Sequence, residues 1–162
     1  YRKGFYIAKS EGDKIGLDVF ASAEITTADT GKDYLIYGVE EDFFLKFPNL
    51  YGYSVQELCG LVHKEGGLLF AAHPYRSGNE IIHPYKLLDG VEVFNANPRS
   101  NNEMASRFAA DNQMIGISGS DSHSAADIGL GGIILDQRVK SNTELAYYIK
   151  KQGYKLIKKE RE

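Results

Sequence analysis

Tryptophan is absent from the 162 residues, and cysteine occurs only once. The single cysteine, Cys59, excludes an internal disulfide and is typical of a reducing compartment, so we expect a cytoplasmic protein. Because Cys59 lies within the helical pattern of residues 57–62, it is predicted to be a buried structural thiol rather than a nucleophile. No apolar run approaches the ~18 residues of a membrane span, and no signal peptide is visible.

The chain also lacks an excess of positive charge. Its 19 basic residues are outnumbered by 22 acids, and the formal net charge of −3 gives no electrostatic footprint for nonspecific nucleic-acid binding. The aromatic residues have no interleaved bases of the kind that a nucleic-acid stacking platform uses. In the tail, residues 155–161, bases and acids alternate, which predicts a solvated end. These features argue against membranes as partners, and against nucleic acid without excluding it.

The remaining composition is that of a soluble globular protein, with 43% hydrophobic and 25% charged residues. A chain of this length can bury roughly 70% of its unfolded surface, so we predict a single domain over residues 1–162. The sequence opens with Tyr1 instead of methionine, and its first residues read as the middle of an element. We therefore expect a fragment of a longer protein.

Helical and strand patterns alternate along the chain. Helices are predicted at 2–17 and 41–47, and after S-x-x-E capping boxes that begin at Ser54, Ser100 and Ser141. Short apolar runs predict strands, the first two of which would pair as a hairpin, at 18–26, 34–39, 68–72, 91–94, 115–118 and 133–135. This alternation predicts an α/β protein with a mainly parallel sheet, either open or closed into a barrel.

Polar side chains stand at the ends of the predicted strands, where α/β proteins carry their function. These residues are Glu24, His73, Asn95, Asp121 and His123. Asp121 and His123 are two residues apart, so an extended backbone would point both into one cavity. Carboxylate oxygen and imidazole nitrogen are ordinary ligands of zinc, manganese or iron. The predicted metal ligands are Glu24, His73, Asp121 and His123; for each residue alone, a hydrogen-bonded structural role is the alternative.

Four motifs that occur in order within residues 5–136 are Ala23-Glu24-Ile25-Thr26, Ala72-His73-Pro74, Gly90-Val91-Glu92-Val93-Phe94-Asn95 and Ser120-Asp121-Ser122-His123. As a set, they resemble the later motifs of the PHP family, the polymerase and histidinol phosphatase superfamily of metal-dependent phosphoesterases. The resemblance implies a distorted (β/α)7 barrel that holds two or three divalent metals. Nothing in this chain matches the H-x-H strand at the start of the family pattern, so the barrel is expected to be incomplete.

The resemblance also implies a role for each predicted ligand. Glu24 matches a carboxylate that bridges two metals, His73 a ligand of one of them, and Asp121 with His123 a pair at the end of a later strand. In the strand after the bridging glutamate, the family often has a histidine where this chain has Tyr34 or a neighbour within residues 33–37. One metal position of the family is therefore unaccounted for.

The activity implied by the resemblance is hydrolysis of a small phosphorylated substrate by a metal-bound water. Asp121 would complete a metal shell or orient the water. Arg76 would grip phosphate oxygens through its guanidinium fork, with a surface arginine as the alternative. The pattern at His83 repeats that at His73, but the longer apolar run before His73 favours His73 as the strand-end histidine. His83 would then line the mouth of the pocket or cap the next helix.

Two other functions remain open at this stage. One is a non-catalytic module of the same fold that binds a phosphorylated ligand or a partner protein, and the other is a plain α/β structural domain. A fragment without the H-x-H strand is expected to bind metal weakly and to have negligible turnover. Because missing strands would leave sheet edges unpaired, homo-oligomers that pair through those edges are also expected.

Overall fold

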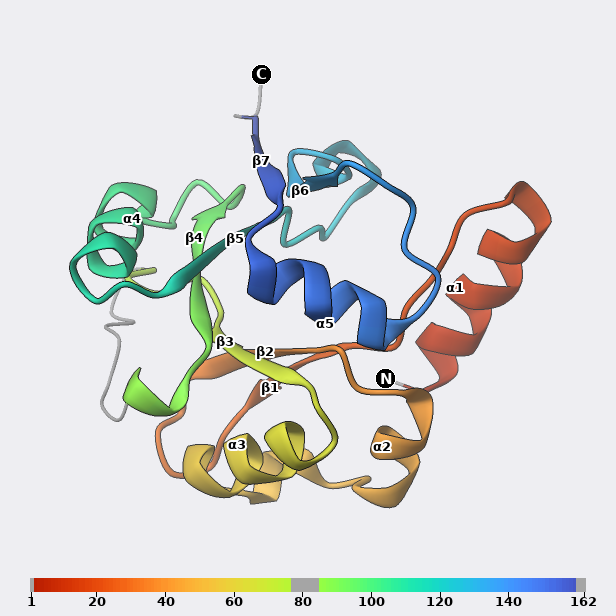
Figure 1. Cartoon of the computed structure of the whole chain (residues 1–162), viewed down its shortest axis with the longest axis horizontal. Coiled ribbons are helices and arrows are strands. Elements are labelled where there is room, and N and C mark those ends of the chain that lie inside the picture. Colours follow the sequence, from red (N-terminus) through yellow and green to blue (C-terminus); the bar gives the residue numbers. More distant parts are fainter. Residues whose placement is uncertain (1, 77–84, 160–162) are drawn as a thin grey trace.

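Helices and strands alternate through the chain, as the capping boxes and apolar runs predict (Figure 1). The structure, a computed structural model, describes residues 2–76 and 85–159; His83 lies outside this part. The helices are α1 (Arg2–Ile15), α2 (Glu41–Lys46), α3 (Val55–Lys64), α4 (Asn102–Asp111) and α5 (Asn142–Lys151). The strands are β1 (Ala23–Thr26), β2 (Asp33–Tyr37), β3 (Leu68–Ala71), β4 (Gly90–Asn95), β5 (Ile115–Gly119), β6 (Gly131–Leu135) and β7 (Tyr154–Lys158). Among the described helices, none has the length and apolarity to cross a membrane.

Strands β1 to β5 form one sheet in chain order, and β6 pairs with β7 in a second, antiparallel sheet. The predicted hairpin of β1 and β2 is confirmed, whereas β2 is also antiparallel to β3. Parallel pairs are therefore limited to β3 with β4 and β4 with β5, and the predicted mainly parallel sheet is mixed, with β2 running opposite to its neighbours. The connection from β1 to β2 is too short for the crossover that a parallel pair needs. The fold is therefore mixed α/β. Within the described residues the five-stranded sheet is open, and no closed (β/α)7 barrel is seen there.

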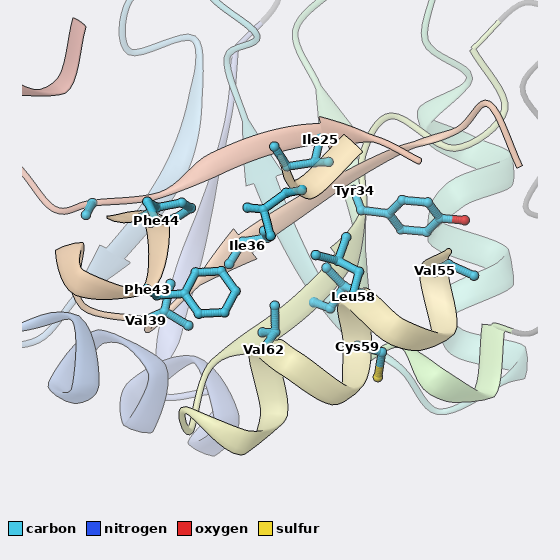
Figure 2. Close-up of a cluster of buried hydrophobic side chains, with 13 residues drawn as sticks. Ile25, Tyr34, Ile36, Val39, Phe43, Phe44, Val55, Leu58, Cys59 and Val62 are labelled. Carbon is cyan, nitrogen blue, oxygen red and sulfur yellow. The ribbon is translucent and has the colours of Figure 1, made fainter. Parts of the chain in front are cut away.

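The larger apolar cluster lies between the β1–β2 hairpin and helices α2 and α3 (Figure 2). Ile36 on β2 is fully buried and packs in this cluster with Leu58 and Val62 of α3. Side chains alternate along a strand, so Leu35 and Tyr37 point to the other face of the sheet, where they pack in a second cluster. Strand β2 is therefore covered on both faces.

Helix α5 lies on that second face, on the side of the sheet opposite α2 and α3 (Figure 1). Its residues Ala146 and Ile149 are buried with Leu68 and Phe70 of β3. Gly38, directly after β2, permits this contact: its φ is +79°, and a Cβ there would lie only 2.4 Å from the Cβ of Ala146. The helix is thus seated against the end of β2.

Two of the three serines predicted to cap helices do so, and one of them, Ser54, forms the full capping box. The Ser54 hydroxyl accepts from the Glu57 amide, and the Glu57 carboxylate accepts from the Ser54 amide at 2.8 Å. Ser141 likewise caps α5 by accepting from the amide of Glu144. The prediction for Ser100 is wrong, because its hydroxyl donates to Asn95 and the cap of α4 is Asn101 instead.

The basic tail was predicted to be a solvated end, but most of it forms β7. Lys155 and Lys158 are exposed, whereas the apolar residues between them pair with β6, with Leu156 opposite Ile133. Tyr154 begins the strand and donates its hydroxyl to the carbonyl of Gly116 at 2.8 Å. The prediction is wrong because the apolar residues interleaved with the charges pair with β6.

Cys59 is buried in α3, as predicted, and its thiol donates to the carbonyl of Leu87 at 2.9 Å. Burial, and secondarily the charge of Asp89, raise the pKa of this thiol. Because the thiolate is the reactive form, we expect DTNB to modify the native protein much more slowly than the guanidinium-unfolded protein. The measurement is the rate of thionitrobenzoate release, and equal rates in the two states would contradict it.

Candidate metal centre

Three ligand-type side chains meet where β1, β2 and β3 adjoin. They are Glu24 of β1, Asp33 at the start of β2, and His73 just after β3, and each offers one atom within 4.8 Å of the others. The Nε2 atom of His73 lies 2.9 Å from Glu24 Oε1 and 3.6 Å from Asp33 Oδ2. Two carboxylates and one imidazole form a suitable donor set for a divalent cation such as zinc, manganese or iron.

The register of the sheet produces this cluster. On the β1–β2 hairpin, Glu24 is paired with Leu35 and Thr26 with Asp33, so alternation puts Glu24 and Asp33 on one face. The carbonyl of Asp33 accepts the amide of Ala72 at 3.0 Å, which brings the next residue, His73, beside it. Three residues spread over about a third of the chain thus converge through strand pairing.

His73 is buried, with a side chain that is 2% exposed, and has an unusual backbone φ of +28°. Its backbone amide donates to Glu92 Oε2 at 2.7 Å, which helps to hold this conformation. Burial lowers the pKa of His73, but the hydrogen bond with Glu24 and the charges of Glu24 and Glu92 raise it, and the net shift is upward despite the opposing charge of Arg76. The two carboxylates therefore favour positive charge at this position, whether from a proton or from a cation.

Asp121 forms an ion pair with Arg76, which joins the two predicted catalytic residues. Their side chains are 10% and 16% exposed. Arg76 also donates to Asn95 Oδ1 at 3.3 Å, while its Nε is buried with no hydrogen-bond partner among the described residues. The charge of the guanidinium also lowers the pKa of His73, three residues earlier in the chain.

His123 lies at the surface, with a side chain that is 76% exposed. Its Nδ1 is 3.5 Å from Asp121 Oδ1 and 2.9 Å from the Asp121 carbonyl oxygen. The backbone at Asp121 has φ +47°, so the extended conformation considered for this segment is not adopted. The buried carboxylate of Asp127 accepts the amides of His123 and Ser124, and so fixes the loop in this shape.

The carboxyl-terminal part of the chain, residues 99–153, matches the family model described as PHP-associated. A two-domain protein from Bacteroides vulgatus, described as containing a predicted PHP-like metal-dependent phosphoesterase, has the same fold with a TM-score of 0.73 and 14% identity. The match covers 98% of this chain and 50% of that one. The chain therefore has the fold of this protein, and its residues 99–153 match the PHP-associated family.

Two further solved structures share the fold. PsfC from Pseudomonas syringae is 19% identical with a TM-score of 0.66, and the match covers 82% of this chain and 56% of that one. A protein from Bifidobacterium adolescentis, whose name proposes a metal-dependent phosphoesterase, is 16% identical with a TM-score of 0.54, over 91% of this chain and 82% of that one. No curated protein matches the sequence significantly. The chain spans about half the length of the first two structures.

The structure brings together two of the four predicted ligands, Glu24 and His73, and adds Asp33. The other two, Asp121 and His123, lie beside each other and beside Arg76. The sequence does not single out Asp33, because the second strand is predicted to begin only at residue 34. The resemblance held a partial signal, since the family often has a histidine in the strand after the glutamate, and Asp33 begins that strand here.

Proposed function

We propose that the protein is a metal-dependent phosphoesterase that holds a divalent cation with Glu24, Asp33 and His73. The observation that carries the proposal is the convergence of their three ligand atoms within 4.8 Å. A cation bound there would polarise a phosphate oxygen and lower the pKa of a coordinated water. The partly exposed side chain of Glu24, 43% accessible, leaves this position open to solvent and substrate.

Arg76 and Asp121 supply the second part of the proposed site. The guanidinium of Arg76 would hold phosphate oxygens by charge-assisted hydrogen bonds, which its planar fork suits better than a lysine ammonium would. Asp121 fixes the orientation of Arg76 through their ion pair and would orient the attacking water. His123, on the exposed side of Asp121, would join the metal ligands when substrate and cations are bound. The substrate class is a small phosphate ester.

We also propose that the whole protein forms the (β/α)7 barrel implied by the PHP resemblance, with two or three metals. The support is the match of the chain to about half of each of the first two solved relatives. Strands added at the free edges of the sheet would complete the barrel. Alternatively, these edges would pair with a second copy of the chain. We also propose a cytoplasmic location, because a single cysteine is typical of a reducing compartment.

The test is phosphatase activity of the full-length protein across a panel of small phosphate esters, with metal content measured on the same samples. We expect Mn²⁺-dependent turnover in the wild type, loss of turnover in His73→Ala, and a fall in kcat of about 100-fold in Asp121→Asn, within the range for a group that assists proton transfer. The matched control is Asp111→Asn, an exposed acid at the end of α4.

The outcomes separate the candidate functions. Metal binding with turnover supports the phosphoesterase. Metal or phosphate binding without turnover on any ester would instead favour the non-catalytic module. A wild-type protein that binds neither metal nor phosphate would favour the structural domain, and the proposed function would be wrong.

A further inference from the structure

Glu92 and Asn95 are three residues apart on β4, so a regular strand would point them to opposite faces of the sheet. The pairing of β4 with β5 is irregular at this point: Glu92 lies opposite Ile117, but Phe94 lies opposite Ser118. The extra residue on β4 forms a bulge, which re-aims the side chains that follow it. As a result, Asn95 Nδ2 donates to Glu92 Oε2 at 2.9 Å.

Glu92 is a carboxylate in the protein interior, with only 4% of its surface exposed. Burial raises its pKa, whereas hydrogen bonds from Asn95 and from the His73 amide lower it. Both donors bind the same oxygen, Oε2, and the His73 bond is 2.7 Å long. The other oxygen lies against Gly119, where a Cβ would come within 2.1 Å of Oε1. A buried acid is costly unless it is paired, so its position argues for a role.

Asn95 is 1% exposed and connects Glu92 to the arginine of the site. Its Oδ1 accepts Arg76 Nη2 at 3.3 Å, together with the Ser100 hydroxyl at 3.1 Å and the Asn97 amide at 2.9 Å. The backbone of Asn95 is also fixed, because its amide donates to Oδ1 of Asn102 on α4 and its carbonyl accepts Nδ2 of the same residue. The side-chain amide of Asn95 therefore links the carboxylate of Glu92 to the guanidinium of Arg76.

We propose that Glu92 and Asn95 are positioning residues that hold the cation ligand His73 and the phosphate-binding Arg76 in one fixed relation. The inference rests on the proposed function and assigns a separate role in it to each of the two residues. Glu92 acts on the cation through the backbone of His73, and Asn95 acts on the phosphate through Arg76. Such support matters because partners outside the ligand shell commonly change metal affinity by about 10- to 100-fold when removed.

The first arm of the test measures Mn²⁺ affinity by isothermal titration calorimetry. Glu92→Ala is expected to weaken binding by about 10- to 100-fold, in the range found for outer-shell partners. Glu92→Gln is expected to restore it, because one amide oxygen can accept both donors that now share Oε2. Gly119→Ala should also weaken binding, since its methyl group would displace Oε1 without removing the acid.

The second arm measures the affinity for inorganic phosphate at saturating Mn²⁺, and KM with the best ester of the panel. Asn95→Ala is expected to weaken phosphate binding and raise KM by about tenfold, the effect of one lost hydrogen bond to a charged group, with Mn²⁺ affinity near wild type. The control is Asn97→Ala, which loses a bond to the amide of Arg99 in the same loop and touches neither Arg76 nor Glu92.

Each outcome bears on the inference separately from the proposed function. Unchanged Mn²⁺ affinity in both Glu92→Ala and Gly119→Ala would overturn the inference. If Glu92→Ala does not fold, the result for Gly119→Ala decides. Equal effects of Asn95→Ala and Asn97→Ala on phosphate binding would overturn it too. A wild type that binds Mn²⁺ but hydrolyses nothing would end only the proposed function, and one that binds no Mn²⁺ would end both.

Discussion

Asp33→Asn is expected to weaken the affinity for Mn²⁺ by more than about 100-fold, since loss of partners outside the ligand shell already costs 10- to 100-fold. Asp33 supplies one of the three clustered ligand atoms, through Oδ2. Its other oxygen accepts the Thr26 hydroxyl at 2.5 Å, a bond that an asparagine oxygen can still accept. The asparagine would then turn its uncharged amide nitrogen toward the cation.

The measurement is calorimetric titration with Mn²⁺, compared with Asp111→Asn as the control for loss of one acidic charge. Because the Thr26 bond is retained, the unfolding midpoint of Asp33→Asn should stay close to that of the wild type. A dissociation constant equal to that of the wild type would show that Asp33 is not a ligand. The cluster would then be an ordinary pairing of a histidine with Glu24.

Phe70→Ala is expected to destabilise the protein by about 3–5 kcal/mol, the cost of deleting a buried aromatic ring and leaving a cavity. Phe70 has no exposed surface and packs edge-on against Tyr37, with ring centroids 5.9 Å apart. On its other side the ring fits closely against Gly90, where a Cβ would lie 2.3 Å from Cε1. Phe70 also packs with Ala146 and Ile149 of α5, so its loss would leave a gap between the sheet and this helix.

Urea denaturation followed by circular dichroism gives the change in unfolding free energy. Since whole domains are stable by only about 5–15 kcal/mol, the variant should lose a large part of its stability. Tyr147→Ala on α5 is the control: its ring is 55% exposed, and the expected change is within about 0.5 kcal/mol. A loss below about 1 kcal/mol for Phe70→Ala would mean that the core relaxes around the gap.

Local features of the fold could be predicted from the sequence. The Ser54 capping box involves two residues only three positions apart, and the β1–β2 hairpin joins two strands that are adjacent in the sequence. Both features can be recognised from a short stretch of the chain. The basic tail was misread because a strand of mixed polarity depends on its partner, β6, which lies about twenty residues earlier. The barrel prediction likewise depended on pairings that no local pattern specifies.

The site could be predicted only in part, because several of its contacts depend on pairing between distant strands. Strand-end position was enough to single out Glu24 and His73, but the choice of Asp33 depends on register between strands. The pairing of Asp121 with Arg76 joins residues 45 positions apart. The bulge that turns Asn95 toward Glu92 appears only in the pairing of β4 with β5. Regular alternation would have predicted the opposite orientation.

The position of α5 against Gly38 has a consequence for how the domain can change. Asp33 and Gly38 stand at the two ends of β2, roughly 17 Å apart along an extended strand. The contact with α5 and the metal-binding carboxylate are therefore at opposite ends of the same short strand. Substitutions among the cation ligands do not touch the contact between α5 and Gly38. The metal-binding residues can therefore change while the packing of α5 against the other end of β2 keeps the domain folded.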